Sequence, residues 1–144
     1  MEIDMRRLPL VIAAAGLAAV AGGTAVIAAS EPAPALSARD QAKLDAALAG
    51  KTAGPPQSCI PLVQIRNTTY VGNRTILYRI SSKLVYRNDP PGGCPGLREG
   101  SGLITSTPTG MLCSGDIAHV RDFVAGFSTG ACALGDFVPY RTPK

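Results

Sequence analysis

The stretch TILYRISSKLVYRN, residues 75–88, predicts a β-hairpin. Large apolar and aromatic side chains fall on alternate positions of its first arm, residues 76–80, and would share one face of a strand. A three-residue turn at residues 81–83 would bring the second arm back alongside the first, with aromatic side chains packed across the strands. The predicted cross-strand pairs are Tyr78 with Tyr86 and Ile80 with Leu84.

Short segments rich in Val, Ile, Thr and Tyr surround this hairpin, separated by turns rich in Gly and Pro. Gly72-Asn73 is a two-residue turn signal with Gly at the first position, so residues 60–71 and 75–80 would form a second hairpin. This pattern predicts a mainly β fold, a small barrel or sandwich of about six short antiparallel strands with one N-terminal helix, stabilised by disulfides. The predicted strands are residues 60–71, 75–80, 84–88, 103–107, 117–124 and 133–140.

The first 30 residues have the composition of a secretory signal peptide. Arg6 and Arg7 precede an uncharged run from Leu8 to Ser30, and small-x-small cleavage patterns occur near and after its end. The alternative is an uncleaved anchor, because the uncharged run has 23 residues and about 20 suffice to span a bilayer. We therefore expect an exported, periplasmic protein, or one anchored in the inner membrane and facing the periplasm.

Residues 31–58 form a connector that leads to the β domain, residues 59–144. EPAPA at its start is a Pro/Ala spacer. The following SARDQAKLDAALAGK, residues 37–51, predicts a short helix that needs a docking partner to be stable. Its predicted N-cap is Ser37, its capping-box acid is Asp40, its apolar stripe is Leu44, Ala47 and Leu48, and its end is marked by Gly50.

The charge balance is mildly basic. The chain carries a net charge of +4, and the exported part keeps this value because residues 1–30 contain two basic and two acidic residues. Such an excess permits an anionic ligand without requiring one, and it is smaller than nucleic-acid-binding domains usually show. We expect no nucleic-acid partner, no cofactor, and contact with a membrane only through an uncleaved leader.

Four cysteines lie in the exported part, which predicts two disulfides in a domain of this size. Three pairings are possible, and sequence cannot decide between them. No pair has C-x-x-C spacing and the chain has a single histidine, which argues against a redox motif and a transition-metal site. The preferred pairing is Cys94–Cys113 with Cys59–Cys132.

The segment MLCSGDIAHV, residues 111–120, contains that histidine, six residues after Cys113 and three after Asp116. A nucleophilic cysteine needs a base within hydrogen-bond reach and an environment that favours the thiolate. In an oxidising compartment we expect a bridged Cys113, with His119 on a strand surface and Asp116 in a turn. The alternative hypothesis is a small thiol/His enzyme around Cys113 and His119.

Two arginines raise a separate possibility. With Gly72-Asn73 as the turn, Arg66 would lie directly opposite Arg79, and like charges across a ladder are destabilising. We favour a register shift by a bulge or splayed side chains, since the charges of exposed arginines are easily screened. The alternative is that the two side chains share an anion, which would make the Arg66/Arg79 face an anion-binding site.

Six segments of the chain resemble a family of small exported bacterial proteins classed as a domain of unknown function. The resemblance rests on four cysteines combined with CPGL, LCxxD and CxLGxF, and it covers residues 48–140. The chain departs from the family at two turns, Gly72-Asn73 and Ser81-Ser82, where acidic and glycine-rich turns are expected. The resemblance implies an exported domain whose cysteines belong to a shared pattern, and it implies no catalytic residues. The segments are CIPLVQIR, RTILYRI, KLVYRN, CPGL, LCSGDI and CALGDF.

These features favour a non-catalytic structural or binding module in the periplasm, since the sequence contains no recognisable catalytic, cofactor or metal motif. The anion-binding module on the Arg66/Arg79 face and the thiol/His enzyme around Cys113 and His119 are the two alternatives.

Overall fold

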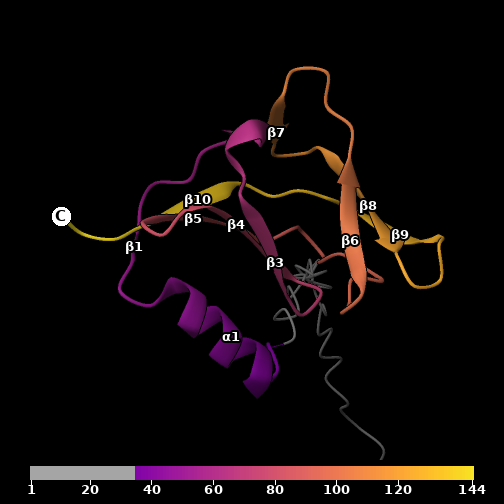
Figure 1. Ribbon diagram of the computed structural model, residues 1–144, viewed down its shortest axis with the longest axis horizontal. Coiled ribbons are helices and arrows are strands. Elements are labelled where there is room, and N and C mark those ends of the chain that lie inside the picture. The colour runs from indigo at the N-terminus through magenta and orange to yellow at the C-terminus, as the bar shows by residue number, and fades with distance from the viewer. Residues whose placement is uncertain (1–34) are drawn as a thin grey trace, which may run out of the picture. The chain divides into compact units, whose positions relative to one another are not determined.

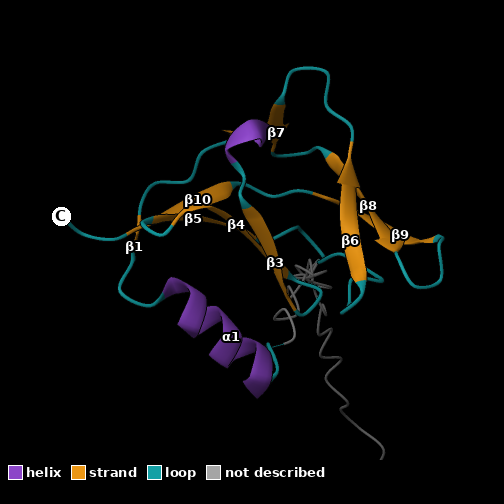
Figure 2. Ribbon diagram, in the orientation of Figure 1, coloured by secondary structure: helices purple, strands orange, loops and turns teal. Residues whose placement is uncertain are grey.

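The computed structural model describes residues 35–144, so the predicted leader at residues 1–30 lies outside the described residues (Figure 1). Within them one helix precedes ten short strands (Figure 2). No helix among residues 35–144 is long and apolar enough to cross a membrane. The elements are α1 (Ala38–Leu48), β1 (Thr52–Ala53), β2 (Cys59–Pro61), the 3-10 helix η1 (Leu62–Gln64), β3 (Asn67–Val71), β4 (Thr75–Ser81), β5 (Leu84–Asn88), β6 (Ser101–Thr105), β7 (Met111–Cys113), β8 (Ile117–Asp122), β9 (Ser128–Ala133) and β10 (Phe137–Arg141).

The strands form three antiparallel sheets, in the orders β1-β10-β5-β4-β3, β6-β8-β9 and β2-β7. The prediction of a mainly β, disulfide-stabilised fold with one N-terminal helix is confirmed. The sheets have open edges, so the described strands do not close into a barrel. The prediction of about six strands is too low, because residues 60–71 divide into β2, η1 and β3 and other short strands were not expected.

β4 and β5 form the hairpin that the alternating pattern predicts. Tyr78 lies opposite Tyr86, as predicted, and both side chains are buried. The ring centroid of Tyr78 lies 5.8 Å from that of Phe137 on β10, at an interplanar angle of 52°. Tilted pairs of this kind are favoured by the ring quadrupoles, so these aromatic rings anchor the sheet to the centre of the core.

The other predicted pair of this hairpin is wrong. The register shifts between Arg79 and Ser81, and Leu84 lies opposite Ser81 rather than Ile80. A β-bulge places one extra residue on β4, and the turn then needs only two residues, 82 and 83.

The five-stranded sheet buries apolar side chains on both faces. On one face Leu44 of α1 covers Val71, Leu77 and Val85. The opposite face packs against the two smaller sheets around the fully buried Phe137. The predicted apolar stripe of α1 is thus confirmed, and docking on the sheet supplies the stability that an isolated helix of 11 residues lacks.

Both ends of α1 also follow the prediction. The Ser37 hydroxyl accepts the backbone N–H of Asp40 at 3.1 Å and donates to the Asp40 carboxylate at 2.8 Å. The helix ends at Leu48, shortly before Gly50, which has a φ of 67°. Glycine adopts this left-handed conformation without strain, so it permits the chain to leave the helix.

The structure has two disulfides, as predicted, but the preferred pairing is wrong. Cys59 is bonded to Cys113, and Cys94 is bonded to Cys132. The first pair follows from strand pairing, because β2 and β7 run antiparallel with Cys59 directly opposite Cys113 and a Cα–Cα distance of 4.0 Å. The second bond joins the loop after β5 to β9. The pairing depends on contacts between distant strands, which the spacing of cysteines along the chain does not encode.

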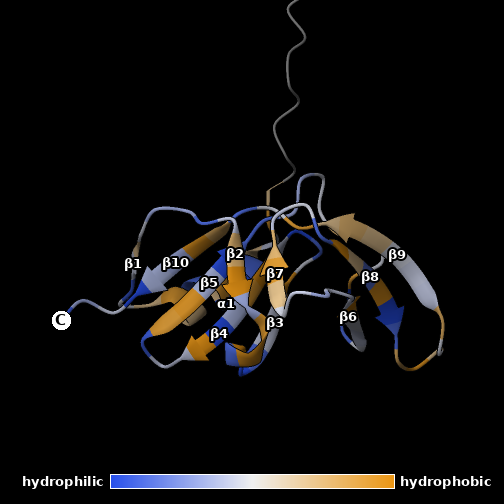
Figure 3. Cartoon of the chain, turned by 90° about the horizontal axis from the view of Figure 1, so that it is seen from above, coloured by the Kyte–Doolittle hydropathy of each residue, from blue (hydrophilic) through white to orange (hydrophobic). Residues whose placement is uncertain are grey.

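The sheet β6-β8-β9 lies at one end of the described residues (Figure 3). Side chains alternate along β8 as predicted, with Ala118 and Val120 buried and His119 exposed. The loop that begins at Cys94 covers the inner face so closely that a Cβ on Gly130 would lie 2.1 Å from the Pro95 carbonyl oxygen. One face of this sheet is therefore packed, while its outer face is open.

Candidate functional site

The Cys113–His119 group is not assembled for thiol chemistry. Cys113 is bonded to Cys59, and no cysteine of the described chain is free. The Asp116 carboxylate accepts the backbone N–H of Cys113 at 2.7 Å and so stabilises the turn before β8. The thiol/His enzyme hypothesis requires a Cys113 thiolate, and the Cys59–Cys113 bond leaves no such group in this structure. Residues 35–144 also bring together no group of three His, Cys, Asp or Glu side chains that could hold a metal ion.

Arg66 and Arg79 do not lie directly opposite each other. The turn between β3 and β4 has three residues, 72–74, rather than the predicted two, so Asn67 lies opposite Arg79. The backbone N–H of Arg66 donates to the Arg79 carbonyl at 2.8 Å. Both side chains are exposed, and neither lines either of the two cavities described below. The shared-anion site stays a prediction, with no cavity to support it.

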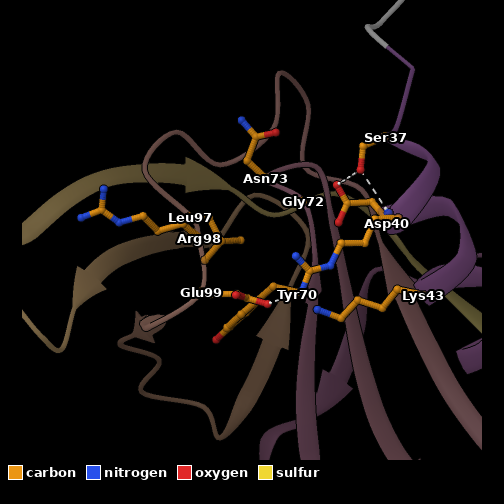
Figure 4. A pocket seen from close by; sticks show the side chains of 10 residues that line it. Ser37, Asp40, Lys43, Tyr70, Gly72, Asn73, Leu97, Arg98 and Glu99 are labelled. Carbon is orange, nitrogen blue, oxygen red and sulfur yellow. Dashed lines mark hydrogen bonds and ion pairs between the residues drawn. The ribbon is translucent and has the colours of Figure 1, made fainter.

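A cleft of about 690 Å³ lies between α1, the end of β3 and the loop that follows Cys94 (Figure 4). Lys43 and Glu99 lie on opposite sides of the cleft, and Tyr70 is drawn beside Glu99 (Figure 4). The size is within the range of ligand sites. The lining consists of Ser37, Arg39, Asp40, Lys43, Tyr70, Gly72, Asn73, Leu97, Arg98 and Glu99.

Most charges in this cleft are already paired. Arg39 contacts Glu99 at 3.2 Å, and Asp40 accepts the Ser37 hydroxyl. Arg98 points away from the cleft, toward Asp122 (Figure 4). The Arg39–Glu99 pair is fully open to solvent and therefore contributes little binding or stability. The cleft thus has room for a ligand but presents few unpaired groups to select one.

A second cavity, of about 250 Å³, lies between β3 and β6, and its lining combines aliphatic side chains with two threonines and two tyrosines. The Tyr70 hydroxyl accepts the Leu103 N–H at 3.1 Å and so joins the edge strands of two sheets. Burial, and then the neighbouring Tyr70, raises the pKa of the Tyr78 hydroxyl, which stays protonated. Since ligand cavities usually exceed about 300 Å³, this one suits packing better than ligand binding.

Exposed large apolar side chains gather in the loop between β8 and β9. Phe123, Val124 and Phe127 are 65%, 89% and 59% exposed, and we call these three residues the apolar tip. In Figures 1 and 3 this loop projects from the end of the described residues. Single exposed apolar residues are common, but a group of three marks an interaction surface.

The backbone of the tip is fixed by Asp122, the last residue of β8. Its carboxylate Oδ1 accepts the N–H groups of Val124 and Ala125 at 2.9 and 3.0 Å, and Oδ2 pairs with the Arg98 guanidinium. The Ala125 N–H, then the Arg98 hydrogen bond, then the Val124 N–H lower the pKa of Asp122 to about 2. The Asp122 side chain is only 6% exposed, and both of its oxygens are hydrogen-bonded. These bonds hold the backbone of the tip in one conformation, so the tip is an ordered loop.

Two guanidinium groups flank the tip. The Arg98 guanidinium is paired with Asp122 at the base of the tip, and the Arg98 side chain is 65% exposed. Arg121 is exposed on β8, and its guanidinium donates to the Gly126 carbonyl at 2.9 Å. The carboxylate that hydrogen-bonds the tip is that of the buried Asp122, and the exposed Glu99, next to Arg98 in the chain, is paired with Arg39. The surface around the tip therefore combines apolar side chains with exposed positive charge.

The outer face of the β6-β8-β9 sheet continues this surface. Phe123 lies over β6, since a Cβ on Gly102 would come within 2.6 Å of its ring. Ile104 and His119 lie opposite each other on neighbouring strands, and both are exposed. Ile117, two residues before His119, is also exposed. His119 is therefore on a strand surface, as predicted, and lies within an apolar surface rather than in a cavity.

Phe123 and Val124 are predicted as the end of a strand, whereas β8 ends at Asp122. The apolar character of these residues favours a strand, but Asp122 before them and Gly126 after them are turn-forming residues. The Asp122 carboxylate accepts the backbone N–H groups of Val124 and Ala125, and Gly126 has a φ of 79°. Asp and Gly at such positions indicate a turn, so this surface was accessible to sequence analysis.

Comparison with protein-family models, with curated proteins and with solved structures found no match to this chain. The two disulfides are typical of proteins in an oxidising compartment. The protein is thus a disulfide-stabilised, mainly β domain, and its candidate functional surface is the apolar tip.

Proposed function

We propose that the protein is an exported, non-catalytic binding module of the bacterial envelope, which docks onto a partner surface through the apolar tip. The observation that carries this proposal is the exposure of three large apolar side chains on a loop whose backbone is fixed by the buried Asp122. Exposed apolar area favours association. An ordered loop binds without a further cost of ordering.

Three features support a periplasmic location. The leader has the composition of a signal peptide, and all four cysteines are bridged, which is typical of proteins in an oxidising compartment. The resemblance to small exported bacterial proteins with the same four-cysteine pattern agrees with both. A binding role also agrees with the bonding of the residues that a thiol enzyme would use, since Cys113 is in a disulfide and the Asp116 carboxylate stabilises a turn.

The test is association with envelope membranes. The protein is exported in a bacterial host, purified from the periplasmic extract, weighed intact to establish its N-terminus, and mixed with washed envelope membranes. We expect the wild-type protein to sediment with the membranes and the Phe123→Ser/Phe127→Ser variant to stay in the supernatant.

The matched control is Val63→Ser, which removes an apolar side chain that is 86% exposed on η1, outside the tip. This control should sediment like the wild type. Equal sedimentation of the wild type and the double variant would show that the tip is not the docking surface, and loss of binding in the control would show nonspecific adhesion.

A further inference from the structure

We propose that the partner surface is an anionic lipid bilayer. The apolar tip inserts into the interfacial region, and the guanidinium groups of Arg98 and Arg121 contact lipid phosphates. This inference rests on the proposed function and names the occupant of that surface.

The apolar part of the argument is the composition and placement of the tip. Phe123, Val124 and Phe127 follow one another closely around a single projecting loop (Figures 1 and 3). An aromatic or aliphatic side chain gains free energy when it leaves water for the boundary between headgroups and acyl chains. A bilayer accepts such a loop without a matching depression, whereas a protein partner must supply one.

The charge part is that two exposed cations lie beside the tip, while the Asp122 anion is buried and the exposed Glu99 anion is paired with Arg39. The Arg121 guanidinium lies at the tip through its bond to the Gly126 carbonyl, and Arg98 extends into solvent beside Asp122. The Asp122 carboxylate is satisfied by two N–H groups and Arg98, so it does not face an approaching phosphate. Guanidinium groups bind phosphates in a forked geometry, which suits lipid headgroups.

The charge of the whole described unit acts in the same direction. Residues 35–144 carry a net charge of +5, because residues 1–34 contribute two basic and three acidic side chains to the chain's +4. Each basic residue near an anionic membrane surface is attracted to it, and the attraction falls off over about a Debye length. Binding should therefore weaken as salt is added.

The order of the tip favours insertion. The Phe123 N–H donates to the Gly100 carbonyl at 3.1 Å, and the Gly126 N–H donates to the Asp122 carbonyl at 2.8 Å. The Asp122 N–H in turn donates to the Phe127 carbonyl at 3.0 Å. Backbone groups that bond within the loop enter the interface without losing hydrogen bonds to water, which is the main cost of membrane insertion.

A second copy of the chain is a less suitable occupant, because neither cavity described above complements the tip. The 690 Å³ cleft has charged walls, and the 250 Å³ cavity is small for two phenylalanine rings. Burying the tip in the cleft would remove Arg39 and Glu99 from water without replacing their hydration, which is unfavourable.

The experiment uses tryptophan fluorescence, because the chain contains no tryptophan. Phe127→Trp places a single reporter in the tip, and Val63→Trp places the matched reporter on η1. Each variant is mixed with vesicles of phosphatidylcholine alone, or of phosphatidylcholine with phosphatidylglycerol, with and without brominated acyl chains. The same measurements with washed envelope membranes separate lipid from protein partners.

We expect the emission of Phe127→Trp to shift to the blue with phosphatidylglycerol vesicles and to be quenched by brominated chains, while Val63→Trp stays unchanged. Adding Arg121→Gln should weaken binding roughly fivefold, since one basic residue contributes about 1 kcal/mol at an anionic surface. Added salt should weaken binding of both proteins.

Three results would overturn the inference. If the Phe127→Trp reporter responds to envelope membranes but to no lipid vesicle, the partner is an envelope protein rather than the bilayer. The proposed function would then stand, and the inference of a lipid partner would fall. A shift that depends on protein concentration without vesicles would assign the tip to a second copy. No response to any membrane would remove both proposals.

Discussion

The Arg98 guanidinium is paired with the Asp122 carboxylate across 24 positions of sequence. This pair joins the loop that follows Cys94 to the residue at which β8 ends and the apolar tip begins. The same Asp122 side chain accepts the Val124 and Ala125 N–H groups. The ordering of an exposed hydrophobic loop thus depends on one buried carboxylate.

The first prediction concerns acid. The pKa of Asp122 is lowered from 3.8 to about 2 in the folded protein, so folding favours the ionised carboxylate. Its contribution to stability is present above about pH 4 and is lost as pH falls from about 4 to about 2. We expect the thermal midpoint of the wild type to fall more steeply over this interval than that of Asp122→Asn.

Asparagine is a suitable replacement because its amide oxygen still accepts the Val124 and Ala125 N–H groups, while the charge on Arg98 loses its partner. The control is Asp45→Asn on the exposed face of α1, which should keep the wild-type slope. Parallel pH profiles for the wild type and Asp122→Asn, measured by circular dichroism, would contradict this role of Asp122.

The second prediction concerns the disulfides. A peptide map of the non-reduced protein should contain Cys59 linked to Cys113 and Cys94 linked to Cys132. The bonds span 54 and 38 residues, so chain entropy assigns each about 4 kcal/mol, with a difference of only about 0.3 kcal/mol. Burial should therefore decide which bond matters more.

Cys94 and Cys132 are both buried in the core, whereas Cys59 and Cys113 are half-buried. We expect Cys94→Ala/Cys132→Ala to lower the free energy of unfolding by about 1 kcal/mol more than Cys59→Ala/Cys113→Ala, because it also leaves a small core cavity. Urea denaturation measures both values. The reverse order would show that loop length outweighs core packing here.

The third prediction concerns Gly130, where β9 meets the Pro95 carbonyl. A Cβ there would lie 2.1 Å from that backbone oxygen, next to the Cys94–Cys132 bond. Gly130→Ala should destabilise the fold by about 1–3 kcal/mol through overpacking. Gly54→Ala is the matched control, because its Cβ would lie 3.2 Å from a ring carbon of Pro139 and 3.6 Å from the Pro139 carbonyl oxygen, both much farther than the 2.1 Å at Gly130. Equal thermal midpoints of the two variants would contradict the close approach of this loop to β9.

Local pattern explains what the sequence predicted well. Ile76 and Tyr78 occupy alternate positions, which predicts a strand, and the pairing of Tyr78 with Tyr86 follows from a short turn. The helix over residues 37–51 was predicted from its cap and apolar stripe, and both are present at α1. These features depend on residues that are near one another in the chain.

The errors come from one-residue shifts and from long-range pairing. The turn after β3 includes Arg74, so Arg79 lies opposite Asn67 rather than Arg66. A bulge on β4 places Leu84 opposite Ser81 rather than Ile80. Local sequence distinguishes such turns poorly, since each alternative uses the same residues. The cysteine pairing and the Arg98–Asp122 pair depend on how β2, β7 and the loop after β5 assemble, which no local pattern encodes.

The central claim is that the apolar tip is the surface by which this protein binds in the envelope. Hydroxyl-radical footprinting of the wild-type protein tests it without any substitution, since Phe123, Phe127 and Tyr70 are oxidised in proportion to their exposure. We predict that envelope membranes lower the oxidation of Phe123 and Phe127 several-fold and leave Tyr70, in the cleft, unchanged. Protection of Tyr70 with no change at Phe123 and Phe127 would contradict the claim and assign binding to the cleft.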